Sequence, residues 1–483
     1  MAERARLNIQ KPETLKTRLP VIYSSMSIQS FTNGERRLEA ENYLLGGFGL
    51  RLKLESLCSG QNLGALANIW QPSRLKAVLV KESVGTPFLA ATQVFDARPV
   101  PRKFLALEKT SETSQRFLNP GDLVVTRSGS VGRATMINNS HEGMLISDDL
   151  LRLSIKDSNM RGWIYAYVRT RQIREIMQSS QYGHVIKHLE TQHLKSIPVF
   201  LPSEEIIRRF ADIFNKITDL RGSYTTLRKE VEKIYESELN IDPLSLNLGN
   251  YLTISSKQIF SKRRRFESGY YCLPNRQFEG YLVEQKIDQV YLGQVAKCEV
   301  PKRFKHIYVK EGIPYVDSAD ILEFNPDNKK NIAPGSINTE EYTVDKDTII
   351  MPCSGQIYGN LGQAILSNEF FENKILSNHI MRIHPREEID AGYLCCVLSH
   401  PTLGRPRLQS IAFGHSVPEL APEDIEDLTV PRLGKQIEDE ISRLYREAAE
   451  AHGRADILER ELELEAEQVI QKRLSLKDLA AKN

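Results

Sequence analysis

Two stretches of the chain place apolar residues at alternating spacings of four and three, which is the a/d pattern of a coiled-coil seam. We therefore expect long helices over 203–240 and 433–474, with 475–483 as a tail. The second pattern stops at Glu465. The seam positions are Ile206, Phe210, Ile213, Ile217, Leu220, Tyr224, Leu227, Val231 and Ile234 in the first stretch, and Ile437, Ile441, Leu444, Ala448, Ala451, Ala455, Leu458 and Leu462 in the second.

The middles of the two helices differ in side-chain size. Large residues occupy 217–224 in the first, whereas alanines occupy the seam over 448–455 in the second. An antiparallel pair would bring these stretches face to face, with the size complementarity that close packing needs. Gly222 and Gly453 hold equivalent positions and predict a tight crossing or a bend. Two alternatives remain open: separate amphipathic helices that pack on their own domains, or a homodimeric coiled coil.

The chain also repeats itself at an offset of about 225 to 231 residues, in order and over most of its length. Duplication without two-site function is the plain alternative. The matched passages are Tyr182-Gly183-His184 with Phe413-Gly414-His415, Leu63-Gly64 with Leu292-Gly293, Gly85 to Leu89 with Gly312 to Val316, Ser147 to Leu153 with Ser377 to Ile383, and Arg36 to Glu39 with Arg264 to Glu267.

Within each half, short apolar runs bounded by Gly, Asn, Pro and Ser predict strands and turns. Examples are the runs at 123–126, 145–146, 150–153, 348–351 and 379–383. A helical stretch is expected at 163–177, with a counterpart at 391–398. The predicted fold is α+β: two tandem-repeat mixed domains, 1–202 (with 1–20 irregular) and 241–432, held apart by two long helices in an antiparallel coiled coil with pseudo-twofold symmetry.

Composition narrows the class of protein. The 483 residues are 41% apolar, which suits two or more folded domains. The six cysteines form no CxxC pair, and no apolar run reaches the ~20 residues that span a bilayer, so we expect a cytoplasmic protein with reduced thiols, no structural metal and no membrane contact. The chain has no Pro-Pro, which an adenine-methyltransferase turn needs, and no P-loop. We expect no catalytic residue.

Two matched domains on a rigid spacer suit duplex DNA or two copies of a protein partner, and the architecture alone does not decide between them. The chain resembles the specificity (S) subunits of type I restriction–modification systems, whose two target-recognition domains are separated by long helices. The passages that carry this resemblance are Gly121 to Gly132, Ser179 to Val199, Leu201 to Glu205 at the start of the first helix, and their repetition in the second half.

The resemblance implies a non-catalytic subunit that reads an interrupted, two-part site on double-stranded DNA and docks DNA methyltransferase subunits, of which two are expected. S-adenosylmethionine would sit in that partner, and a restriction or translocase subunit, where present, would bring ATP and Mg²⁺. An ordinary type I system, a type II relative and another DNA-modification or defence complex remain open. The rival hypothesis is a two-partner protein scaffold in such a complex that reads no bases.

Charge suggests where DNA would be contacted. Residues 63–200 hold 18 Lys and Arg against 11 Asp and Glu, whereas 292–431 hold 13 against 20, so the second domain must concentrate its positive charge. Arg suits guanine, and Gln or Asn suits adenine, which predicts two different half-sites. A basic run, 262–265, is either a further contact or a solvated linker. The expected DNA-binding residues are Arg98, Arg102, Lys103, Arg127, Ser128, Ser130, Arg133, Tyr182 and His184 in the first half, and Lys302, Arg303, Lys305, Ser354, Gln356, Tyr358, Asn360 and His415 in the second.

Overall fold

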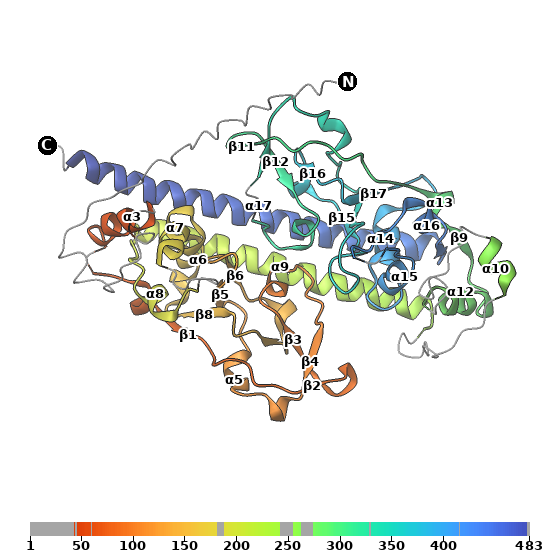
Figure 1. The fold of residues 1–483 in the computed structure, drawn as a ribbon, viewed down its shortest axis with the longest axis horizontal. Helices are drawn as coiled ribbons and strands as arrows, with labels where there is room; N and C mark the ends of the chain where they lie inside the picture. The colour runs from red at the N-terminus through yellow and green to blue at the C-terminus, as the bar shows by residue number, and fades with distance from the viewer. Residues whose placement is uncertain are drawn as a thin grey trace, which may run out of the picture.

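Two long helices lie side by side through the centre of the molecule (Figure 1). The computed structural model describes residues 43, 46–58, 60–180, 188–241, 255–261, 274–327, 330–414 and 416–480. Helix α9 (Glu204–Glu238) has 35 residues and α17 (Lys435–Ala480) has 46. Arg209 near the start of α9 pairs with Glu465, whereas Val231 near its end shares a core cluster with Ile441. The helices therefore run antiparallel, as the heptads predict.

The size complementarity at the middle of the pair is confirmed. Tyr224 packs with Ala448 and Ala451 in one buried cluster. Beyond Glu465 the apolar line continues through Ala466, Ile470 and Leu474, now at a spacing of four, and joins the core of the first domain. The helix consequently extends six residues past the predicted end at 474, because its packing partner changes from α9 to the first domain.

A buried charge cluster lies at the centre of the helix pair. Arg221 is 1% exposed, and its Nη2 lies 2.5 Å from Asp456 Oδ1 and 3.3 Å from Glu459 Oε1. Burial raises the pKa of Asp456, but Arg221 and His452 outweigh it and lower that pKa to about 2. The heptad pattern does not reveal this cluster, because arginine beside the seam position Leu220 is usual on a solvated helix face.

Each domain contains two four-stranded sheets with the same strand order. The order is β1-β8-β5-β6 and β2-β4-β3-β7 in the first domain, and β10-β17-β14-β15 and β11-β13-β12-β16 in the second. Only the β3–β7 and β12–β16 pairs are parallel. The strands of these sheets are β1 (Ala67–Trp70), β2 (Leu79–Val80), β3 (Thr86–Leu89), β4 (Lys103–Leu105), β5 (Leu123–Thr126), β6 (Ala134–Met136), β7 (Leu145–Ile146), β8 (Leu150–Ile155), β10 (Ala296–Glu299), β11 (Tyr308–Val309), β12 (Ile313–Val316), β13 (Asn331–Ile332), β14 (Ile349–Pro352), β15 (Ile365–Leu366), β16 (Ile375–Leu376) and β17 (Ile380–Pro385). The second domain also has a two-stranded antiparallel sheet of β9 (Gln289–Tyr291) and β18 (Thr429–Pro431).

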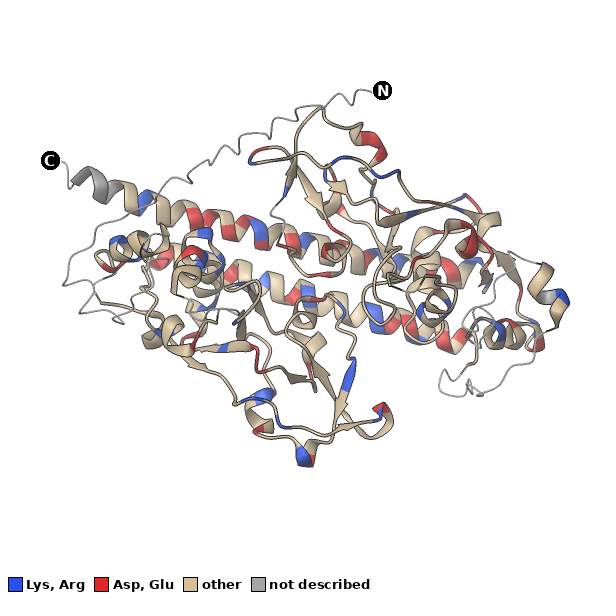
Figure 2. Cartoon of the chain, viewed as in Figure 1, with Lys and Arg blue, Asp and Glu red and all other residues tan. Residues whose placement is uncertain are grey.

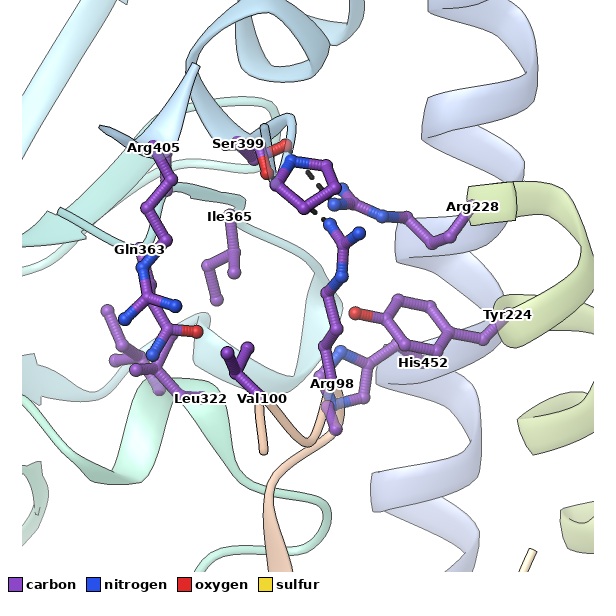
Figure 3. Close-up of a pocket in the computed structure, with 14 residues that line it drawn as sticks. Arg98, Val100, Tyr224, Arg228, Leu322, Gln363, Ile365, Ser399, Arg405 and His452 are labelled. Carbon is purple, nitrogen blue, oxygen red and sulfur yellow. Dashed lines mark hydrogen bonds between the residues drawn. The ribbon is translucent and has the colours of Figure 1, made fainter. Parts of the chain in front are cut away.

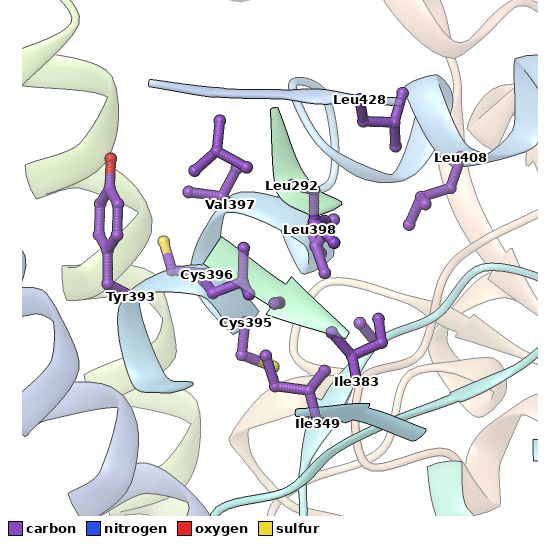
Figure 4. Packing of buried hydrophobic residues seen from close by; sticks show 14 of the residues in the cluster. Leu292, Ile349, Ile383, Tyr393, Cys395, Cys396, Val397, Leu398, Leu408 and Leu428 are labelled. Atoms are coloured by element: carbon purple, nitrogen blue, oxygen red, sulfur yellow. The ribbon is translucent and has the colours of Figure 1, made fainter. Parts of the chain in front are cut away.

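Short helices fix each domain to the long pair. A methyl group at Gly162 on α6 (Arg161–Arg169) would collide with the Phe210 carbonyl of α9, and Gly392 on α14 (Ala391–Ser399) meets Ser442 of α17 in the same way. Apolar residues of α14 and the neighbouring strands complete the core of the second domain (Figure 4). The predicted helix 163–177 is two helices, because the chain turns to an extended conformation at Thr170 before α7 (Arg171–Ser180).

The glycines of the long helices have another role than predicted. A side chain at Gly453 would clash with Asn368, the N-cap of the 3-10 helix η9 (Glu369–Phe371), and the nearest side chain to Gly222 is Asn139 of η4 (Asn139–His141). The prediction of a tight crossing between the helices is wrong. Gly453 instead makes room for a turn of the second domain, whereas a Cβ at Gly222 would meet Asn139 at 3.7 Å, an ordinary contact distance.

The two domains also contact each other directly, which corrects the expectation that the helices hold them apart. The Ala97 amide donates to the Leu322 carbonyl and the Phe324 amide donates to the Phe95 carbonyl, both at 2.8 Å. Asp96 and Glu323 form the bridge between these bonds. Because the partners are equivalent positions of the repeat, the pseudo-twofold axis passes through this contact. We call residues 95–98 and 322–325 the junction.

Among the described residues, no helix combines the length and apolar character that crossing a bilayer requires.

Arg221→Met should strongly destabilise the helix pair, because it leaves Asp456 and Glu459 buried without their cation. Breaking a buried pair in this way costs about 3–5 kcal/mol. The matched control is Arg209→Met, which removes an ion pair between the same helices whose arginine is 59% exposed and which should cost less than about 1 kcal/mol. The measurement is chemical unfolding of the full chain. Equal losses in the two variants would contradict a central role for the buried cluster.

Candidate nucleic-acid interface

Two glycine-containing turns occupy equivalent places in the domains. The turn 127–133 follows β5, and the turn 354–360 follows β14. The Arg127 amide donates to the Asp149 carbonyl at 3.2 Å, and the Cys353 amide donates to the His379 carbonyl at 2.9 Å. Each turn is therefore fixed by the loop that leads into the long strand of its sheet, β8 or β17.

A buried arginine fixes each of these supporting loops. Arg152 donates to the carbonyls of Ile146 and Ser147 at 2.8 and 2.9 Å, and Arg382 donates to those of Leu376 and Ser377. Burial lowers the pKa of both guanidinium groups to about 10. The sequence repeat includes both arginines, but only the structure shows that they brace the two turns in the same way.

The exposed side chains on the two turns differ in chemistry. In the first turn, Arg127 is 21% exposed and its Nη2 lies 3.2 Å from Glu190 Oε1. In the second, Ser354 shares a 2.8 Å hydrogen bond with His379, and Tyr358 is 80% exposed. Ser130 and Gln356 are also exposed, whereas Ser128 and Asn360 are partly covered. One backbone frame thus presents two different sets of hydrogen-bonding groups.

Arg98 and Arg133, which we expected to contact DNA, join the two domains. Arg133 Nη1 donates to Glu323 Oε1 at 3.0 Å, and its guanidinium lies 3.9 Å from the centre of the Phe95 ring. Arg98 Nη2 lies 2.8 Å from Glu232. Each of these arginines pairs with a carboxylate that lies far away in the sequence, and its contact with DNA stays a prediction.

Each turn also lies beside the other repeat. Arg102 and Lys103 are exposed, and Arg102 Nη2 lies 3.6 Å from the position that a Cβ at Gly359 would occupy. The first turn borders a cleft of the second repeat that is rich in acids. Residues of this cleft are Ser130, Arg133, Tyr315, Asp317, Asp320, Glu323, Asp327 and Lys330. The surroundings of the two turns therefore differ in charge, with the basic one at 354–360.

The basic cluster predicted in the second domain is exposed at Lys302, Arg303 and Lys305. The structure adds aromatic rings, which the sequence reasoning missed. His306 stacks on Tyr308 at 5.6 Å with 21° between the ring planes, and a further ring, Phe304, lies 4.5 Å from His306. The alternation of aromatic and basic residues over 302–308 is the sequence feature that could have indicated these ring contacts. Basic groups interleaved with rings suit contacts with phosphates and bases.

Lys and Arg are distributed among Asp and Glu over both domains and both long helices, and they do not form one continuous basic band (Figure 2). Three expected contacts, Tyr182, His184 and His415, and the basic run 262–265 lie outside the described residues. The candidate interface in the described part of the chain therefore consists of the two turns, the pair Arg102–Lys103, and the cluster at 302–308.

Comparison with solved structures finds type I restriction–modification S subunits. The crystal structure of such a subunit from M. genitalium has 15% sequence identity and a TM-score of 0.28, with 87% of this chain and 93% of that chain covered. A structure of a type I R-M system concerned with complex assembly and conformational transition has 12% identity and a TM-score of 0.27, covering 84% and 98%. The crystal structure of the HsdS subunit from Thermoanaerobacter tengcongensis has 12% sequence identity and a TM-score of 0.25, with 86% of this chain and 95% of that chain covered.

A scan of protein-family models and a search of curated proteins gave no match.

Asp96→Asn should change the pH dependence of stability at the junction. Burial, and then Glu323, raises the pKa of Asp96 from 3.8 to about 8. Between pH 4 and pH 8 the Asp96 carboxyl therefore keeps its proton in the folded state but loses it in the unfolded state. The free energy of unfolding of the wild type consequently falls as the pH rises through this range. The stability of the variant relative to the wild type should rise over that range, on the order of a few kcal/mol, and level off above pH 8.

The measurement is urea unfolding of both proteins between pH 5 and pH 9. Asp212→Asn, at an exposed position of α9, is the control and should keep the wild-type profile. A constant difference between Asp96→Asn and the wild type across this range would show that Asp96 is charged in the folded protein.

Proposed function

We propose that this chain is the non-catalytic DNA-recognition subunit of a restriction–modification-type complex, and that it reads a two-part, interrupted site on duplex DNA. The observation that carries the proposal is that the turns 127–133 and 354–360 have the same backbone support but present different side chains. Arg152 and Arg382 brace equivalent turns, yet Arg127 stands on one turn and Gln356 with Tyr358 on the other. Two turns that carry different side chains at a fixed separation suit a DNA site with two different half-sites.

Each proposed contact has a chemical role. Arg127 suits a guanine edge and Gln356 an adenine edge, and each bidentate contact discriminates by about 1–3 kcal/mol. Arg102, Lys103 and the basic cluster at 302–305 would neutralise phosphates and set the register of the protein on the duplex. Ser128, Ser130, Ser354 and Asn360 belong to the same two turns and remain secondary candidates.

The proposal places the chemistry in partner subunits. DNA methyltransferase subunits, two by the pseudo-twofold symmetry, would dock against the long helices and the domains and would hold S-adenosylmethionine. A restriction or translocase subunit would bring ATP and Mg²⁺ where the complex also restricts. The symmetry of the helix pair supports two equivalent docking places, because α9 and α17 each pack on both domains.

The second candidate is a protein scaffold that reads no bases. The acidic cleft beside the first turn favours it, since Asp317, Asp320 and Asp327 would repel a phosphate backbone and attract a basic protein. The salt dependence of binding to random duplex separates the two hypotheses. Neutralising about five phosphates predicts a loss of affinity of roughly 10²–10³-fold between 50 and 200 mM salt, whereas a scaffold would show no such binding.

Arg127→Ala should relax selectivity at one half-site only. The change removes the arginine of the first turn that does not pair with the second domain, and it leaves the second domain intact, so we expect a loss of about 1–3 kcal/mol of discrimination at the affected positions. The measurement is selection of bound sequences from a randomised duplex library by the full chain with its methyltransferase. The control, Arg171→Ala, removes an 82% exposed arginine elsewhere in the same domain and should leave selection unchanged. Equal relaxation at both half-sites would contradict two independent readers.

A further inference from the structure

A cavity of about 80 Å³ lies where both repeats and both long helices meet (Figure 3). The first repeat contributes the loop 97–100 and α9 contributes Tyr224 and Arg228. The second repeat contributes 363–365 and 399–405, and α17 contributes His452. The cavity adjoins the junction, so any molecule inside it would contact the whole pseudo-twofold centre at once.

Three arginines from three different segments line this cavity, and their positive charge exceeds the negative charge near them. Arg98 and Arg228 share one carboxylate, Glu232, at 2.8 and 3.6 Å. Both also reach Ser399: Arg98 donates to its carbonyl and Arg228 to its hydroxyl (Figure 3). One carboxylate therefore serves two guanidinium groups.

The third arginine, Arg405, has no carboxylate within ion-pair distance among the residues that the structure describes. Its Nη2 donates to the Gly359 carbonyl at 2.6 Å, and its Nε makes no hydrogen bond. Burial, and then the charges of Arg98 and Arg102, lower the pKa of Arg405 to about 10. Asp96 also acts electrostatically on Arg405, but burial raises the pKa of this carboxyl to about 8, so the negative charge that it offers at neutral pH is reduced.

The remaining groups around the cavity do not remove this imbalance. His452 pairs with Asp456, whose charge is already shared with Arg221. His400 lies behind the cavity near Glu236 and stays neutral, since burial lowers its pKa to about 3. The Arg228 Nε, like that of Arg405, is buried without a hydrogen-bond partner. Buried cations in this state are costly unless an anion joins them.

The size of the cavity limits the anion. A cavity of about 80 Å³ exceeds the ~10–15 Å³ that one water needs and is smaller than the ~150 Å³ cavity that holds benzene. Gln363 offers a further polar contact, and Val100 and Ile365 contribute methyl groups to the lining. A tetrahedral oxyanion fits this space, but a nucleotide or a strand of duplex DNA does not.

We propose that the cavity binds one small tetrahedral oxyanion of the phosphate or sulfate type, held by Arg98, Arg228 and Arg405. Because these residues come from the first repeat, the first long helix and the second repeat, the ion cross-links the junction and stiffens the relative placement of the two domains. This site adjoins the second turn through the hydrogen bond from Arg405 to the Gly359 carbonyl, but binding of the ion needs neither DNA nor a methyltransferase.

The direct test is calorimetric titration of the full chain with sodium phosphate at constant ionic strength in sodium chloride. We expect one ion per chain, and at least tenfold weaker binding in Arg405→Gln and in Arg98→Gln. The control Arg454→Gln removes the same charge from an exposed position of α17 and should bind as the wild type does. Equal affinity in all four proteins, or no saturable heat in the wild type, would overturn the proposal.

A second variant protects the test against misfolding. Gln363→Glu would place a carboxylate where we locate the anion, so it should raise the melting temperature in chloride and remove the specific response to phosphate. Phosphate and sulfate also stabilise proteins by general exclusion, and that part of the response should remain equal in every variant. A phosphate-induced rise in Gln363→Glu as large as in the wild type would contradict the site.

Discussion

The carboxylate of Asp456 connects the parts of this molecule. It belongs to α17, accepts the guanidinium of Arg221 from α9, and accepts the backbone amide of Asn325 from the second domain at 2.7 Å. Because Asp456 is fully buried, it cannot exchange these partners for water. The position of the helix pair and the position of the junction therefore depend on one charged group.

This constraint is compatible with the proposed recognition role, because it fixes two repeated domains relative to each other. The interior keeps the repeat: equivalent sheets, equivalent glycine contacts at Gly162 and Gly392, and equivalent buried arginines at 152 and 382. The turns that these features support are exposed and carry different groups. The separation of the turns is set by α9, α17 and the junction together, so a change in the helices alone would have to break contacts between Arg133 and Glu323.

Much of this fold follows from periodicity. The heptads predict both long helices, their antiparallel pairing and the contact between Tyr224 and the alanines, because apolar spacing reports helix packing directly. The strand at 123–126 has the predicted bounds, and those at 348–351 and 379–383 lie within one or two residues of them.

Charged residues were harder to place. Arg98 and Arg133 have the composition and loop setting of DNA contacts, yet their carboxylates lie far along the chain, and Glu323 is 190 residues from Arg133. Arg221 and Arg228 stand at positions where a coiled coil is usually solvated, and only the packing of both domains on α9 buries them. The stacked rings at 306 and 308 do not follow from the balance of Lys and Arg against Asp and Glu, because Tyr308 carries no charge and the stacking depends on the fold.

The central claim is that two unlike readers at a fixed separation direct modification to one interrupted site. The most direct measurement is to express this chain with its neighbouring methyltransferase in a modification-free host and to map modified bases by long-read sequencing. The account predicts one motif of two different half-sites with a constant spacer, which disappears when this chain is omitted. Modification that is unchanged without this chain, or a motif with only one half-site, would contradict it.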